Sequence, residues 1–184
     1  TTRGWYANEA GDRKCQFIIR YHFHAGSAAV RVMYTWLMTE DSRDLRFSDI
    51  GFCLPVRCTE VAFALEDGGL LRQSVPNAEP AGLVQVDFDR FRLLQGGAEG
   101  DGRPLGLVRA TGPQVSCDLQ VRDFRALFPK ELSATAEGLT FHVWLAHGQD
   151  NPDRKIEDAN LQYIWYAHEG RVLDFQAPEA FYSH

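Results

Sequence analysis

The sequence predicts an all-β protein, an antiparallel β-sandwich of about ten strands with one short helix near residues 122–128. Three observations predict this class. Apolar and polar residues alternate with a period of two along most of the chain, Gly-containing turns separate these segments, and only one stretch has helical spacing. The 184 residues show no internal repeat and no shift in composition, so we expect a single β-sandwich domain, 1–184.

A long hairpin dominates the first part of the chain. Alternating residues from Cys15 to Phe23 predict a half-buried strand, and Ala25-Gly26-Ser27 predicts the turn. The segment from Val30 to Met38 then continues with the same period and completes the hairpin. Further strands are predicted, in chain order, at 50–56, 61–65, 70–74, 83–94, 107–110, 115–121, 139–145, 161–168 and 172–175.

Turns and one predicted helix separate these strands. Asp67-Gly68-Gly69 is a strong hairpin signal, and the strand at 83–94 is expected to break near Asp89. Residues 95–106 hold five Gly and one Pro and are predicted to form the most mobile internal loop. At 122–128, Phe124, Leu127 and Phe128 have the i, i+3, i+4 spacing of an apolar helical stripe, which Pro129 closes.

Charge and composition exclude several functions. Lys plus Arg is 19 and Asp plus Glu is 25, a net charge of −6, which argues against a nucleic-acid partner. No apolar run is long enough for a membrane span, and no spacing indicates a metal or another cofactor. The chain opens on Thr1 without signal-peptide features, so we expect either a removed leader or one part of a longer multidomain protein.

The four cysteines do not form a zinc motif. Cys15, Cys53, Cys58 and Cys117 are widely spaced, and no His lies near them at ligand spacing. Two interpretations remain open at this point. They are separate small core residues, or two of them, for example Cys53 and Cys58, form a disulfide in an exported protein.

Histidines and aromatic residues are the candidates for a functional surface. His22 and His24 are two apart on a strand and share a face, which suits a polar or sugar-contacting surface better than a metal site without a third ligand. Exposed aromatic rings stack on sugars, although the Trp residues could instead fill the core. The candidate carbohydrate-binding residues are His22, His24, His142, Trp144, His147, Trp165, Tyr166 and His168. No motif of a known catalytic site is present, so no residue is assigned a catalytic role.

Three segments together resemble one family. They are RYHFHAGSAAVRVMYTW (20–36) with the return at 49–55, VRDFRALFPKEL (121–132) with GLTFHVWLAH (138–147), and IWYAHEGRVLDFQAP (164–178). In this order they are similar to the central β-sandwich domain of the exo-acting rhamnogalacturonan lyase-like proteins, which include the bacterial YetA-like proteins. The resemblance covers most of the chain.

The resemblance implies a role in pectin degradation. It implies an acidic plant-type polysaccharide or oligosaccharide as ligand, other domains of the same protein as partners, and a secreted or periplasmic location. In the parent protein it implies β-elimination at uronic acid residues, with this domain as scaffold and part of the sugar-contacting surface. Two alternatives remain, a free-standing carbohydrate-binding module and a structural or assembly protein without saccharide chemistry.

Overall fold

The structure is a computed structural model of the 184-residue chain, and it describes residues 1–37, 39, 50–76, 79–122, 124, 130–144 and 172–175, the last four and 143–144 by their backbone alone. All strand pairs in this part of the chain are antiparallel, which confirms the predicted all-β class. The one complete helical element among the described residues is a 3-10 turn, Gln95–Gly97, and the single residue Phe124 also has 3-10 conformation. None of the described helical residues forms a segment long and apolar enough to cross a membrane.

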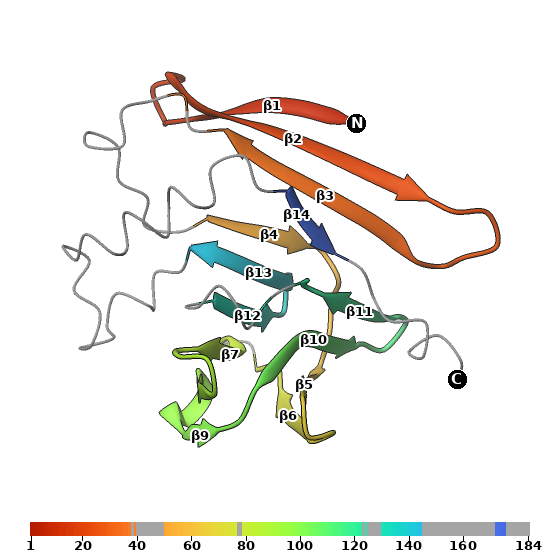
Figure 1. Ribbon diagram of the computed structural model, residues 1–184, viewed down its shortest axis with the longest axis vertical. Helices are drawn as coiled ribbons and strands as arrows, with labels where there is room; N and C mark the ends of the chain where they lie inside the picture. Colours follow the sequence, from red (N-terminus) through yellow and green to blue (C-terminus); the bar gives the residue numbers. More distant parts are fainter. Residues whose placement is uncertain are drawn as a thin grey trace. The chain divides into compact units, whose positions relative to one another are not determined.

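The chain divides into two compact units. The first comprises residues 1–47 and 156–176, and the second comprises 48–155 and 177–184. The first unit carries one four-stranded sheet and the second carries a four-stranded and a six-stranded sheet, as Figure 1 shows by colour along the chain. The prediction of a single domain over 1–184 stays a prediction.

The sheet of the first unit is built on the predicted hairpin. Its strand order is β1-β2-β3-β14, and the strands are β1 (Thr2–Ala7), β2 (Arg13–Phe23), β3 (Val30–Leu37) and β14 (Val172–Phe175). The sequence predicted β2, β3 and β14, and the turn Ala25-Gly26-Ser27 falls between β2 and β3 as expected. The short strand β1 was not predicted, because Gly4 interrupts an already brief apolar alternation.

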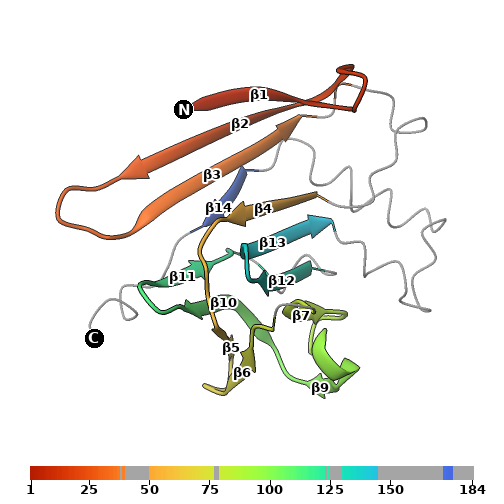
Figure 2. The ribbon, with the colours of Figure 1, turned by 180° about the vertical axis from the view of Figure 1, so that it is seen from behind.

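The second unit is a β-sandwich. The smaller sheet has the order β11-β10-β5-β6 and the larger sheet β4-β13-β12-β7-β8-β9 (Figure 2). The strands are β4 (Ile50–Leu54), β5 (Glu60–Leu65), β6 (Leu70–Ser74), β7 (Ala81–Gln85), β8 (Arg90–Leu93), β9 (Glu99–Asp101), β10 (Pro104–Thr111), β11 (Ser116–Gln120), β12 (Lys130–Thr135) and β13 (Gly138–Trp144). The Gly82 N–H of β7 donates a buried 2.7 Å hydrogen bond to Gln73 Oε1 of β6, which links the two sheets.

The core of the sandwich comes from one face of each sheet. In the smaller sheet Phe63 of β5 lies between Val108 of β10 and Leu71 of β6. In the larger sheet the paired residues Leu132 and Phe141 point to the same face and are fully buried. Apolar burial on this scale is the main source of stability for a β-sandwich.

Strand β12 is buried on both faces. Lys130 and Leu132 alternate with Glu131 and Ser133, and all four side chains are buried. The two charged neighbours, Lys130 and Glu131, therefore point to opposite faces of the same strand. The sequence analysis did not predict β12, since its alternation is short and follows directly on Pro129.

One prediction within the second unit is wrong. Residues 95–106 are not a simple loop, because β9 pairs with β8 and β10 begins at Pro104. The Gly-rich composition suggested a loop, but Gly100 lies under the Phe91 ring, where a Cβ atom would come within 2.5 Å of it. The expected break of the strand at 83–94 near Asp89 is confirmed, since β7 and β8 are separate paired strands and Asp89 lies in the connection between them.

Several predictions fall outside the described residues. Most of the helix expected at 122–128 lies there, as do the strand at 161–168 and the segment 148–159. The four cysteines are free thiols, which confirms that they are separate and that Cys53 and Cys58 form no disulfide. Only Cys15 and Cys58 are buried core residues, because Cys53 is exposed and Cys117 is half-buried. Burial raises the pKa of the Cys58 thiol.

Tyr6 provides a pH test of the first unit. Its hydroxyl hydrogen-bonds the hydroxyl of Tyr34, and its ring lies 5.4 Å from that of Phe17. Burial, with a smaller contribution from the nearby Cys15, raises the pKa of the Tyr6 phenol to about 12. Because the folded-state pKa lies above the unfolded value, the associated stability is present below about pH 10 and is lost as pH rises through about 12.

We expect a near-ultraviolet difference titration of wild type against Tyr6→Phe to isolate one phenol. Its midpoint should lie at about 12, and the pH dependence of unfolding above about pH 10 should be weaker in the variant. A difference titration centred at the ordinary tyrosine value of about 10 would show that Tyr6 is solvated.

Candidate functional site

One face of the first unit's sheet gathers positive charge. Arg3 pairs with Ile18, Arg20 pairs with Met33, and His22 pairs with Arg31. Because directly paired residues on antiparallel strands share a face and side chains alternate along each strand, these groups all point to one side. We call this surface the basic face, and it consists of Arg3, Trp5, Arg20, His22 and Arg31.

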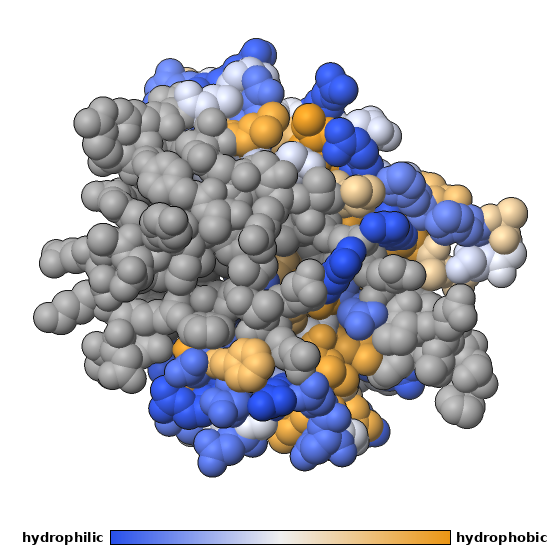
Figure 3. All heavy atoms as spheres, viewed as in Figure 1, coloured by the Kyte–Doolittle hydropathy of each residue, from blue (hydrophilic) through white to orange (hydrophobic). Residues whose placement is uncertain are grey.

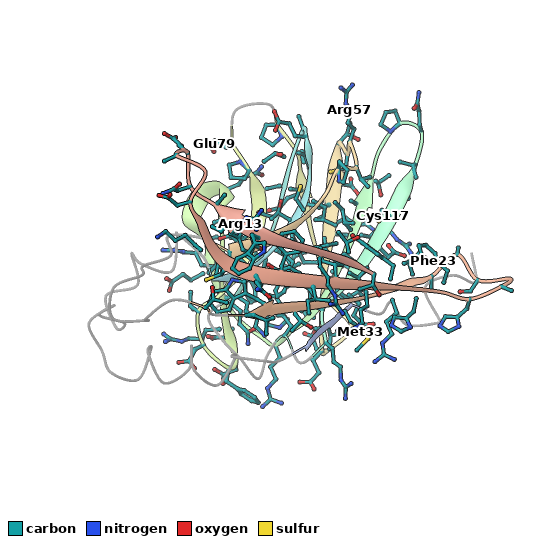
Figure 4. The ribbon with its side chains drawn as sticks, turned by 90° about the horizontal axis from the view of Figure 1, so that it is seen from above. Arg13, Phe23, Met33, Arg57, Glu79 and Cys117 are labelled. Atoms are coloured by element: carbon teal, nitrogen blue, oxygen red, sulfur yellow. The ribbon has the colours of Figure 1, made fainter. Side chains whose placement is uncertain are left out.

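The pictures agree with this assignment. In Figure 4 Met33, which pairs with Arg20, and Phe23, which belongs to the other face, lie on opposite sides of the hairpin. In Figure 3 hydrophilic residues follow the hairpin on the side turned toward the viewer. By the register of β2 on β3, Arg20, His22 and Arg31 lie on one side of the hairpin, and Tyr21, Phe23 and Val30 lie on the other.

Acidic residues are scarce on this sheet. No Asp or Glu occurs between Arg13 and Leu37, and among the residues of the sheet's four strands Asp174 of β14 is the only acidic one. Asp174 pairs with Met33, so it stands in the same row as Arg20. Residues 1–37 contain five Arg or Lys and two Asp or Glu, a balance of three positive charges in a chain whose net charge is −6. The two acids, Glu9 and Asp12, lie between β1 and β2. Such a local excess attracts anionic ligands although the protein as a whole is acidic.

Trp5 adds an aromatic surface to the basic face. Trp5 pairs with Gln16, which places it on the same side as Arg3, and its side chain is 40% exposed. The Arg13 guanidinium lies 5.9 Å from the centre of the Trp5 ring, within cation–π range. An exposed indole flanked by guanidinium groups offers stacking to a sugar ring and hydrogen bonds to its substituents.

Arg20 is held in place by its neighbours on the sheet. The Arg20 Nη1 group donates a hydrogen bond to Thr35 Oγ1 at 3.4 Å, and Arg20 is half-buried on β2. An arginine that is already oriented loses less conformational entropy on binding than a freely rotating one. The basic face is therefore partly preorganised at its centre.

A second polar cluster lies in the larger sheet of the second unit. His142 Nε2 is 2.9 Å from Ser133 Oγ and 3.6 Å from Glu131 Oε1, across the β12–β13 pair. In a serine–histidine–acid triad the hydroxyl and the carboxylate contact different ring nitrogens. Here both contact Nε2, and Ser133 and Glu131 are buried, so the cluster joins two strands and does not have the geometry of an activated nucleophile.

The sequence-predicted site residues fall into three groups. His22 lies on the basic face, and His24 follows the end of β2, where its carbonyl accepts a hydrogen bond from Ser27 N–H. His142 belongs to the second unit, where Trp144 ends β13. The remaining candidates, His147, Trp165, Tyr166 and His168, lie outside the described residues. No group of three or more His, Cys, Asp or Glu side chains in the described ranges could hold a metal ion.

Most of the basic face is not predictable from local sequence spacing. Arg3, Trp5, Arg20 and Arg31 were not among the candidates, since their common side depends on the pairing of three strands. A usable signal was present, because a hairpin of this length without any acid is uncommon in a chain of net charge −6.

Comparisons with known proteins add no family assignment. No protein-family model matches the chain, and no curated protein matches it significantly.

Proposed function

We propose that the chain is the carbohydrate-binding β-domain of a secreted or periplasmic polysaccharide lyase-like protein, and that it binds an acidic saccharide on its basic face. The observation that carries the proposal is the grouping of Arg3, Trp5, Arg20, His22 and Arg31 on one side of a sheet with a single acidic strand residue. The resemblance of residues 20–36 to the rhamnogalacturonan lyase-like proteins supports it, since this segment forms the hairpin of that face.

The chemistry of the face suits uronic acid residues. A guanidinium group donates two parallel hydrogen bonds to a carboxylate, and several such groups in rows match a polymer that carries a carboxylate on successive residues. The Trp5 ring provides the apolar platform on which the flat side of a pyranose stacks. The domain thus binds and positions saccharide, and no catalytic role is assigned to any of its residues.

The proposal is tested by calorimetric titration with oligogalacturonides, with neutral dextran oligomers as the uncharged comparison. We expect binding of the acidic saccharide only, weakened about 5- to 30-fold by Trp5→Ala and by Arg20→Gln. Raising the ionic strength from about 0.05 M to about 0.5 M should weaken binding further, since the charges are exposed to solvent.

Phe23→Ala is the matched control, because Phe23 lies on the opposite side of the same hairpin. It should leave saccharide affinity unchanged, and all variants should keep the wild-type melting temperature. Failure of the wild-type protein to bind oligogalacturonides, or equal affinity of Trp5→Ala, would exclude the basic face as the saccharide site.

A further inference from the structure

The end of the β2–β3 hairpin presents an apolar surface. Phe23 is 74% exposed, Tyr21 41% and Val30 39%. The Tyr21 and Phe23 rings are stacked, with their centres 6.4 Å apart and an interplanar angle of 27°, and Val30 pairs directly with Phe23. We call the segment from Tyr21 to Arg31 the hairpin tip. Large apolar side chains grouped at an exposed site usually mark a binding surface.

The hairpin tip extends past the other strands of its sheet. The pairing of β1 with β2 ends at Ile19, and the pairing of β14 with β3 ends at Val32. Among the described residues the tip is therefore a two-stranded ribbon beyond both neighbours, visible at the end of β2 and β3 in Figure 1. Residues 25–29 at its end are Ala, Gly and Ser and carry no charge.

Positive groups stand directly behind this apolar end. Arg20 and Arg31 lie on the other side of the ribbon, one residue from Tyr21 and Val30 along each strand, and the polar residue His22 pairs with Arg31 on that same side. No acidic residue lies between Arg13 and Leu37. A partner that fits must therefore be apolar where the tip enters it and negatively charged at its surface.

An anionic lipid bilayer combines these two properties. Aromatic and aliphatic side chains partition into the boundary between headgroups and acyl chains, while arginines reach the phosphate groups along their own aliphatic stems. A narrow uncharged ribbon end can enter this boundary without burying a charge. We propose that the hairpin tip docks the protein onto the surface of an anionic bilayer, with Phe23, Tyr21 and Val30 inserted and Arg20 and Arg31 at the headgroups.

Docking of this kind is weak and depends on both contributions. A few inserted side chains and two arginines give reversible binding, in the range of a single lipid anchor or below. The inserted rings are separate from the saccharide site, since Phe23 and Trp5 lie on opposite sides of the sheet, whereas Arg20 and Arg31 belong to both proposed surfaces. Removal of the inserted ring should therefore affect lipid binding and leave saccharide binding intact.

The experiment is co-sedimentation with sucrose-loaded vesicles of phosphatidylcholine alone and of phosphatidylcholine with about 30% phosphatidylglycerol. We expect binding to the anionic vesicles only. Phe23→Ala should lower the partition coefficient about fivefold, and Phe23→Asp should reduce binding to the background level. The matched control is Phe88→Ala in the second unit, which removes a phenylalanine that is 41% exposed and should not change partitioning.

Three outcomes would overturn the proposal. The first is that the wild-type protein does not bind anionic vesicles. The second is that Phe23→Ala binds the vesicles as well as wild type and has an unchanged melting temperature. This would show that charge attraction alone accounts for the binding. The third is that vesicles are not bound while sedimentation shows self-association lost in Phe23→Ala, which would make the tip a contact between copies of the chain.

Discussion

Replacing Phe63 by alanine is expected to lower the free energy of unfolding by about 3–5 kcal/mol. Phe63 is 1% exposed at the centre of β5, between Val108 of β10 and Leu71 of β6. Removal of the ring leaves a cavity that the surrounding strands can fill only partly, so the lost transfer free energy and the cavity cost add. Urea unfolding followed by circular dichroism measures the change.

The comparison variant is Phe88→Ala, because Phe88 is an exposed residue of the same type. It loses the contact of its ring with the Arg103 guanidinium, 4.9 Å from the ring centre, and should lower the free energy of unfolding by less than about 1 kcal/mol. A similar loss of unfolding free energy in Phe63→Ala and Phe88→Ala would show that Phe63 is not part of the core. The prediction would also be wrong if Phe63→Ala unfolded at the wild-type urea midpoint.

Gly106→Ala is the second change with a large expected effect, about 3 kcal/mol. Gly106 has φ of +71°, and an added Cβ would lie 2.3 Å from Phe124 Cβ and 2.8 Å from the Val121 carbonyl oxygen. Its own carbonyl accepts a 2.8 Å hydrogen bond from Val121 N–H. Relief of the overlap would therefore displace Phe124, whose ring packs against Phe141, or break that hydrogen bond.

Gly68→Ala separates backbone strain from steric overlap. Gly68 also has a positive φ, +86°, but nothing lies within 4 Å of the added Cβ position. Gly68→Ala should therefore lower the free energy of unfolding through backbone strain alone, by about 1 kcal/mol. If thermal unfolding gave the same loss for both variants, the close packing of Phe124 on Gly106 would not contribute to stability.

Strands with a regular alternation and a clear turn were predictable from the sequence. The hairpins β2–β3 and β5–β6 are present with their turns at Gly26 and Gly68, because local spacing and turn residues determine a hairpin. Strands β1 and β12 and the pairing of β9 were missed, since each is short and is stabilised by contacts with distant segments.

The candidate site was less predictable than the fold. Spacing placed His22 and His24 on one strand, but the association of His22 with Arg3 and Trp5 follows from the register of β1 on β2. His142, which the sequence grouped with the surface candidates, instead contacts Ser133 and Glu131 across two strands. Register between distant segments decides which residues share a face, and local spacing does not contain it.

The opposite charges at the start of β12 have a consequence for how the larger sheet assembles. In the native register Glu131 stands opposite His142, and Leu132 stands opposite Phe141. A slip of one residue would place the Glu131 carboxylate opposite Phe141 and would move Lys130 and Leu132 to the side now held by Glu131 and Ser133. Each face of the strand would then bury a charged side chain away from the groups that surround it in the native register. Because burying an uncompensated charge is costly, the adjacent charges of Lys130 and Glu131 disfavour misaligned strands during folding.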